Sequence, residues 1–189
     1  MLNRSEYPAR TTNDDPEIGR QASAMLREEA DALVARAPGV TVGVRVADCT
    51  PVLVADTATG AVAAIHAGWR GVVANVVGAG VRALAPHEDR ASLVAAIFPC
   101  IGACCFEVGE DVAEAIARAS DPGVVLRSYG ARPHVDMRRA VRAQLRALGL
   151  RDDAIDDVPG CTKCGGTQFH SHRRDGDRAG RHVAVITAR

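Results

Sequence analysis

Between residues 41 and 99 the hydrophobic residues fall into short runs, mostly of valine and alanine, with polar turns between them. Short runs rich in β-branched residues and bounded by turn signals predict buried strands. The predicted strands are residues 41–47, 51–56, 61–67 and 91–99, with a closing strand at 182–188. The polar segment 57–60 predicts a tight turn that joins two of these strands into an antiparallel hairpin.

Other segments carry apolar residues at helical spacing, and they predict helices at residues 21–36, 72–85, 109–119 and 135–150. In the last of these, Met137, Val141, Leu145 and Leu148 form one stripe. We interpret the arginines on its other side as a solvated face rather than a binding patch. Strands that alternate with helices indicate an α/β domain.

The chain has 189 residues, which favours one domain with a sizeable core. Residues 1–20 are polar and contain two prolines, so we expect a loose N-terminal segment followed by a single domain over residues 21–189. The chain carries 23 basic and 23 acidic residues, and this balance points neither to nucleic acid nor to an anionic membrane.

No segment predicts a membrane span or a signal peptide. The apolar run 72–85 is too short to cross a bilayer and contains Arg82. Residues 1–19 lack the hydrophobic centre of a signal peptide, so the expected location is cytoplasmic. In that setting the six cysteines are expected as free thiols or metal ligands rather than disulfides.

The predicted hairpin brings a thiol and an imidazole together. With the turn at 57–60, Cys49 lies across from residues 67–68, within a position or two of His66, and cross-strand neighbours have Cβ atoms about 5 Å apart. A thiolate and a neutral imidazole are ligands for zinc or copper, and a Cys–His pair can also activate a nucleophile. The alternative is a buried cysteine packed beside a hydrogen-bonded histidine.

The residues after His66 favour a ligand site. Gly68-Trp69-Arg70-Gly71 ends the strand and opens a helix. The glycines allow a ligand to approach the backbone, and a helix N-terminus attracts anions. The planar guanidinium of Arg70 is suited to phosphate.

These stretches also carry a resemblance to a known family. ADCTPVLVAD (47–56) and IHAGWRG (65–71) resemble the laccase-domain (polyphenol oxidase-like) family, and the likeness continues in PCIGACCFEVGEDV (99–112) and CTKCGGTQFHSHRRDGDRAGRHVAVI (161–186). The family is also described as zinc-dependent purine nucleoside phosphorylases and as a peptidoglycan editing factor. The resemblance implies an α/β fold of layered mixed sheets, related to the catalytic domain of cytotoxic necrotizing factors. It also implies that Cys49 and His66 are two of three metal ligands and the centre of catalysis.

The sequence departs from the family at the third ligand. In the family this is a histidine in a Gln-Val-His-Gly stretch, upstream of the segment that resembles ADALVAR (30–36), whereas this chain has no histidine before His66. Part of the usual N-terminal region is therefore expected to be absent. We expect weak zinc binding and low activity unless His170 or His172 supplies the missing ligand.

Two further polar clusters are candidates for chemistry. Arg173 and Arg174 are expected to bind phosphate, with a surface loop in which one arginine pairs with Asp175 as the alternative. Cys161 and Cys164 resemble half of a zinc knuckle, whose second pair would have to be Cys100 with Cys104 or Cys105. We interpret all of these cysteines as parts of tight loops instead, since similar pairs occur in the resembled family without a knuckle.

The leading hypothesis is a zinc-dependent enzyme in which phosphate attacks C1′ of adenosine, inosine or methylthioadenosine, with adenosine deamination as a possible second activity. Zinc lowers the pKa of bound water to about 7 and acts as a Lewis acid, and the arginines would hold phosphate. A copper-dependent phenol oxidase ranks lower because six histidines are too few for a multicopper site. The third hypothesis is an inactive truncated paralogue or a peptidoglycan-editing factor. The oligomeric state and the preferred nucleoside stay open.

Overall fold

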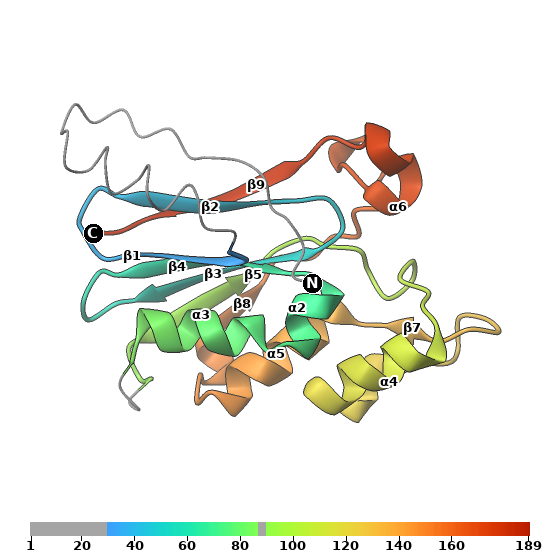
Figure 1. The fold of residues 1–189 in the computed structure, drawn as a ribbon, viewed down its shortest axis with the longest axis horizontal. Coiled ribbons are helices and arrows are strands. Elements are labelled where there is room, and N and C mark those ends of the chain that lie inside the picture. Colours follow the sequence, from blue (N-terminus) through green and yellow to red (C-terminus); the bar gives the residue numbers. More distant parts are fainter. Residues whose placement is uncertain (1–29, 87–89) are drawn as a thin grey trace.

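The computed structural model describes residues 30–86 and 90–189, and its centre is a five-stranded mixed sheet (Figure 1). The strand order is β1-β4-β3-β5-β8, antiparallel except for the parallel pair of β5 and β8. The strands are β1 (Ala32–Ala35), β3 (Thr50–Asp56), β4 (Val62–Ala67), β5 (Leu93–Ile97) and β8 (Ile155–Asp157). Strands β3 and β4 are buried almost throughout, which is why their sequences are continuous apolar runs.

Helices cover one face of this sheet (Figure 1). They are α2 (Trp69–Val73), α3 (Val76–Leu84), α4 (Glu110–Ala119) and α5 (Met137–Ala147). The main core forms here, where Val52, Val54 and Ile65 of the sheet pack with Val77 and Leu145 of the helices, all fully buried. The amphipathic pattern of α5 accounts for this packing, since its apolar stripe is buried.

A two-stranded antiparallel sheet of β2 (Thr41–Val46) and β9 (His182–Thr187) covers the other face. A smaller core lies between the two sheets, built from Val44, Leu53, Ala64 and Ala184. Side chains alternate across a strand, so this layer holds one face of the β3–β4 hairpin while the helices hold the other. The layered α/β architecture with mixed sheets is therefore confirmed.

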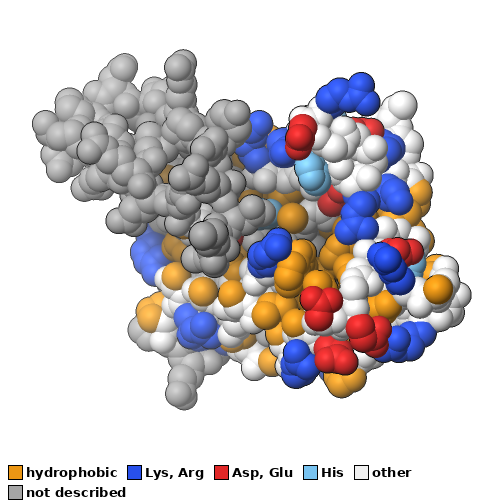
Figure 2. Space-filling view, turned by 45° about the vertical axis from the view of Figure 1, so that its right-hand side comes forward, with side chains coloured by type: hydrophobic (Ala, Val, Ile, Leu, Met, Phe, Trp, Pro, Cys, Tyr) orange, Lys and Arg blue, Asp and Glu red, His pale blue; other side chains and the backbone are white. Residues whose placement is uncertain are grey.

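The remaining elements are short. Strands β6 (Val125–Leu126) and β7 (His134–Val135) form a second small two-stranded sheet. Helix α6 (His172–Asp175) precedes β9 and lies near its first residues (Figure 1). Single 3-10 turns span Pro122–Val124, Asp152–Ala154, Gly166–Gln168 and Gly176–Arg178. Figure 2 shows basic and acidic side chains interspersed over the face in view, as the zero net charge suggests. Within the described ranges no helix has the length and apolar character needed to cross a membrane.

Two predicted helices were wrong in part. Residues 21–29 lie outside the described residues, but Ala32–Ala35 form strand β1, because pairing with the β4 edge overrides the helix preference of alanine and leucine. The helix predicted over 72–85 starts earlier and breaks in two at Ala74 and Asn75. Asn75 adopts a left-handed backbone (φ 58°), and its side chain accepts a hydrogen bond from the N–H of Gly78, which caps α3. The loose segment predicted at 1–20 also lies outside the described residues.

Candidate functional site

The β3–β4 hairpin brings Cys49 and His66 together. Thr50 pairs with Ala67, which confirms the predicted register and sets Cys49 opposite Gly68. The Cys49 sulfur and Nε2 of His66 both face Gly68. A Cβ at Gly68 would lie 3.1 Å from the Cys49 sulfur and 3.9 Å from Nε2 of His66. The missing side chain at Gly68 thus leaves room for the two groups to meet.

Asp31 completes this arrangement, a role that the sequence pattern did not predict. Its Oδ1 accepts a hydrogen bond from Nδ1 of His66 at 2.8 Å, and both side chains are about nine-tenths buried. The pairing of Ala32 with Ile65 places Asp31 across from His66, and the N–H of His66 donates to the Asp31 carbonyl. With Nδ1 bound in this way, Nε2 is directed towards Cys49. The helix predicted over this segment concealed the pairing.

The surroundings of His66 favour its protonated form. Burial, the largest single influence, lowers its pKa, but the hydrogen bonds and charges of Cys49 and Asp31 together outweigh it and raise the pKa to about 9. A metal ion at Nε2 would therefore displace a proton.

Cys49 and His66 fit two ligand positions of a zinc ion, since a thiolate and an imidazole with an outer carboxylate partner are a common zinc donor set. A catalytic zinc normally has three protein ligands. Within residues 30–86 and 90–189, neither residue belongs to a group of three possible ligands. His170 lies against the His182 ring, and Nδ1 of His172 hydrogen-bonds to the Gly176 carbonyl. Among the described residues, neither histidine forms a ligand group with Cys49 and His66.

Arg70 and Arg173, both expected to bind phosphate, have different surroundings. Arg70 is exposed at the start of α2, with its guanidinium 4.3 Å from the centre of the Trp69 ring. The backbone N–H of Arg173 donates to Oδ2 of Asp48 at 2.6 Å, which ties the terminal loop to the residue beside Cys49. The Arg173 side chain donates to the Glu107 carbonyl and lies over the Phe106 ring.

Arg174 is engaged within its own loop, and the phosphate-binding role expected from the sequence stays a prediction. All three nitrogens of its guanidinium are engaged: it pairs with Asp175 and donates to the carbonyls of Thr162, Lys163, Gly166 and Phe169. Arginine has five N–H groups, and these acceptors use them all. Arg174 therefore holds the 161–169 loop together, and the alternative pairing with Asp175 is the one observed.

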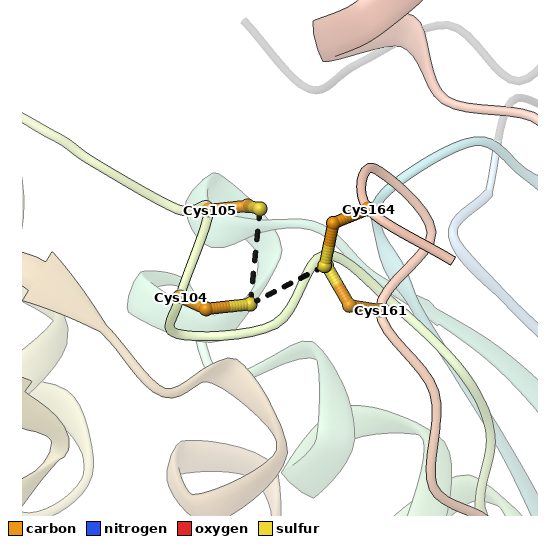
Figure 3. Close-up of side chains that lie close together, drawn as sticks. All are labelled: Cys104, Cys105, Cys161 and Cys164. Carbon is orange, nitrogen blue, oxygen red and sulfur yellow. Dashed lines mark hydrogen bonds between the residues drawn. The ribbon is translucent and has the colours of Figure 1, made fainter. Parts of the chain in front are cut away.

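Four cysteines from two distant loops form a second cluster: Cys104, Cys105, Cys161 and Cys164, with all four sulfurs within 4.8 Å of one another (Figure 3). They could bind a metal. From the sequence, the second pair that a knuckle would need was Cys100 with Cys104 or Cys105, and a knuckle was not favoured. Cys100 is fully buried in the main core and outside the group, and Cys104 with Cys105 is the pair that meets Cys161 and Cys164. The cysteines do lie in tight loops, as interpreted from the sequence, and the sequence did not predict that the two loops meet.

The thiols of the cluster differ in acidity. Burial alone would raise the pKa of Cys161, but N–H groups, including those of Cys164 and Gly102, donate to its sulfur and lower the pKa to about 7. Burial raises the pKa of Cys105 to about 11 and also raises that of Cys104.

An apolar cavity of about 380 Å³ lies on the face of the hairpin that carries His66. Pro51, which pairs with His66 across the hairpin, is part of its wall. The other lining residues are Leu53, Phe98, Pro99, Phe169 and His182–Val185. Its volume lies within the range of small-molecule sites, and the two phenylalanines offer flat apolar surfaces.

Comparisons with known proteins agree with this architecture. The family model described as multi-copper polyphenol oxidoreductase laccase matches residues 9–189. A protein named adenosine deaminase RL5, from an unknown prokaryotic organism, is 38% identical over 174 residues, covering 90% of this chain and 66% of the relative. A purine nucleoside phosphorylase of Bacteroides thetaiotaomicron is 37% identical over 174 residues, covering 87% of this chain and 64% of the relative.

Among solved structures, the crystal structure of YlmD from Geobacillus stearothermophilus superimposes with a TM-score of 0.80 at 31% identity. The likeness covers 90% of this chain and 65% of YlmD. The chain thus spans about two thirds of the length of these relatives.

Proposed function

The chain belongs to the laccase-domain family, and from that premise we propose that it is a zinc-dependent purine nucleoside phosphorylase. The observation that carries the proposal is the series Asp31–His66–Cys49, in which a carboxylate fixes a buried imidazole whose second nitrogen faces a thiol across Gly68. Relatives named purine nucleoside phosphorylase support the choice of substrate class. The substrates are accordingly a purine nucleoside and inorganic phosphate.

In this proposal Cys49 and His66 hold the zinc ion, which supplies a Lewis acid next to the substrate. Asp31 keeps the proton on Nδ1 of His66, so that Nε2 is available as a ligand. The apolar cavity beside Pro51 takes the purine, because its phenylalanines can stack on a flat ring. Arg70 and Arg173 hold phosphate through their planar guanidinium groups.

The reaction moves one bond at C1′ of the ribose. A phosphate oxygen bonds to C1′ while the bond from C1′ to the purine nitrogen breaks, and the bonding electrons leave with the base, which then takes up a proton. The arginines stabilise the phosphate as its charge redistributes.

Adenosine deamination is the second candidate, because the relative at 38% identity is named an adenosine deaminase. In that reaction water replaces the amino group at C6 and ammonia leaves, without phosphate. Copper-dependent phenol oxidation, which the family description suggests, is tested by a parallel incubation of the chain with a phenol and copper in place of the nucleoside and zinc.

The test incubates the purified chain with inosine, adenosine or methylthioadenosine, with and without phosphate, and separates the products by chromatography. Zinc is supplied in excess, because two protein ligands hold it less firmly than three. We expect release of the free base only with phosphate, and a loss of more than about 100-fold in Cys49→Ser and His66→Ala. Arg82→Ala, at an exposed arginine of α3, is the control and should keep the activity.

The outcomes separate the alternatives. Inosine formed from adenosine without phosphate would indicate the deaminase. Activity on phenols that requires copper would replace the proposal. Base release that persists unchanged in His66→Ala would show that this site is not responsible.

A further inference from the structure

We propose that Cys104, Cys105, Cys161 and Cys164 form a structural zinc site, separate from the site at Cys49 and His66. Two loops about 60 residues apart in the sequence supply its four thiols (Figure 3). This site does not depend on the proposed enzymatic activity.

The spacing of the sulfurs matches a tetrahedral zinc ion. With zinc–sulfur bonds of about 2.3 Å, the sulfurs of a tetrahedron lie about 3.8 Å apart. The sulfurs of Cys104 and Cys164 are 3.7 Å apart, as are those of Cys104 and Cys105, and none of the six separations exceeds 4.8 Å. Closing around an ion would thus require shifts of an ångström or less. Four thiolates in a tetrahedron favour zinc over the harder divalent ions.

The backbone around the cluster is shaped for this arrangement. The N–H of Gly102 donates to the Cys161 sulfur at 3.2 Å, which stabilises a thiolate. A Cβ at Gly102 would lie within 3.4 Å of the sulfurs of both Cys104 and Cys161, so glycine allows the two loops to approach. A Cβ at Gly165 would lie 2.5 Å from the Cys161 carbonyl, so the tight turn after Cys164 also requires glycine.

Positive charge lies next to the cluster. A zinc ion bound by four thiolates carries a net charge of −2, and such a centre requires compensation. Lys163 lies between the paired cysteines in the sequence, and the guanidinium of Arg174, which also pairs with Asp175, donates to the carbonyls of Thr162 and Lys163. Cys104 and Cys164 are exposed, so an ion can reach the site from solvent.

The cluster would also hold in place Asp48, the residue that precedes Cys49 of the candidate active site. Thr162, between the two C-terminal cysteines, donates its hydroxyl to Oδ1 of Asp48 at 2.6 Å. The N–H of Ile101, in the other loop, donates to the Asp48 carbonyl at 2.9 Å. Both loops that the zinc ion joins are therefore bonded to the residue that precedes Cys49.

The test measures zinc in the full chain, purified under reducing conditions and freed of loosely bound metal by dialysis. The double variant Cys49→Ser/His66→Ala should keep about one zinc ion per chain, because its cluster is intact. The double variant Cys104→Ser/Cys164→Ser should lose that ion. Cys100→Ala, in the same loop but outside the cluster, is the matched control and should retain it.

A second measurement does not depend on the folding of the cluster variant. X-ray absorption of the Cys49→Ser/His66→Ala protein should find only sulfur neighbours around zinc, at about 2.3 Å. Cobalt in place of zinc should give the visible spectrum of a tetrahedral thiolate site.

Three results would overturn the proposal. The first is a Cys49→Ser/His66→Ala protein that holds no zinc. The second is zinc with nitrogen or oxygen neighbours. The third is a chain whose cluster cysteines are isolated as disulfides and do not take up zinc after reduction.

Discussion

Asp48 joins the hairpin to the C-terminal loop, and replacing it with alanine tests that connection. Its carboxylate accepts two short hydrogen bonds of 2.6 Å each, from the Thr162 hydroxyl and from the Arg173 N–H. Hydrogen bonds to a charged group contribute about 1.5–3 kcal/mol each. Thr162 is fully buried, so its hydroxyl would lose its acceptor away from water. Asp48 also has a left-handed backbone (φ 83°), which alanine tolerates less well than aspartate.

We expect Asp48→Ala to lower the free energy of unfolding by about 3–5 kcal/mol. Chemical denaturation with urea, followed by circular dichroism, measures this change, and the melting temperature should fall by about 10 °C. Asp48→Asn keeps one acceptor oxygen and tolerates the left-handed backbone, so it should cost about 1–2 kcal/mol. Asp156→Ala, at an exposed aspartate of β8, is the control and should stay within about 0.5 kcal/mol.

A double-mutant cycle isolates the bond itself. Combining Asp48→Ala with Thr162→Val should cost at least about 1 kcal/mol less than the sum of the two single changes, because each removes the same bond. The reasoning would be refuted by an Asp48→Ala protein within about 1 kcal/mol of the wild type, or by single changes that simply add.

Three further predictions concern single side chains. Asp31→Asn should weaken zinc binding by about 10–100-fold, because His66 loses the carboxylate that orients it. Competition with a chelator measures the zinc affinity, and an unchanged affinity would contradict the prediction. Arg174→Lys should cost about 1–3 kcal/mol in urea denaturation, because an ammonium cannot reach all the carbonyls that the guanidinium joins, and Arg70→Lys should cost less than about 0.5 kcal/mol. Hydrogen bonds from Ser92, Thr59 and the Ala58 N–H lower the pKa of Asp56 below 3.8. The stability that these bonds give is therefore complete well above pH 3.8 and is lost as the pH falls through the lower pKa of the folded state. Asp56→Asn should make the free energy of unfolding depend less on pH in this acid range.

The hairpin was predictable because its information is local. The polar turn at 57–60 and the valine runs on either side set the register, and the register alone brings Cys49 near His66. The pattern also predicted α4, α5, β5 and β9, because each buries one continuous apolar stripe or run.

The parts that were missed depend on long-range contacts. Asp31 lies in a segment of good helix formers, and only pairing with the edge of β4 makes that segment a strand. The four cysteines lie in loops without periodicity, so no local pattern indicates that Cys105 rather than Cys100 joins the cluster. The left-handed backbone of Asp48 is fixed by bonds to residues 101, 162 and 173, which are distant in the sequence.

Loss of the cysteine cluster should affect the Cys49–His66 site more than the reverse. The reason is that Asp48 links the cluster loops to Cys49 but not to His66. Cys49 follows Asp48, whose position is set by the two loops of the cysteine cluster. His66 and Asp31 lie on β4 and beside β1, where the five-stranded sheet holds them without help from those loops. Loss of the cluster should therefore loosen the thiol while the imidazole and carboxylate stay in place, and zinc should bind less tightly at the hairpin. Loss of Cys49 changes no bond of the cluster, so the cluster should keep its ion.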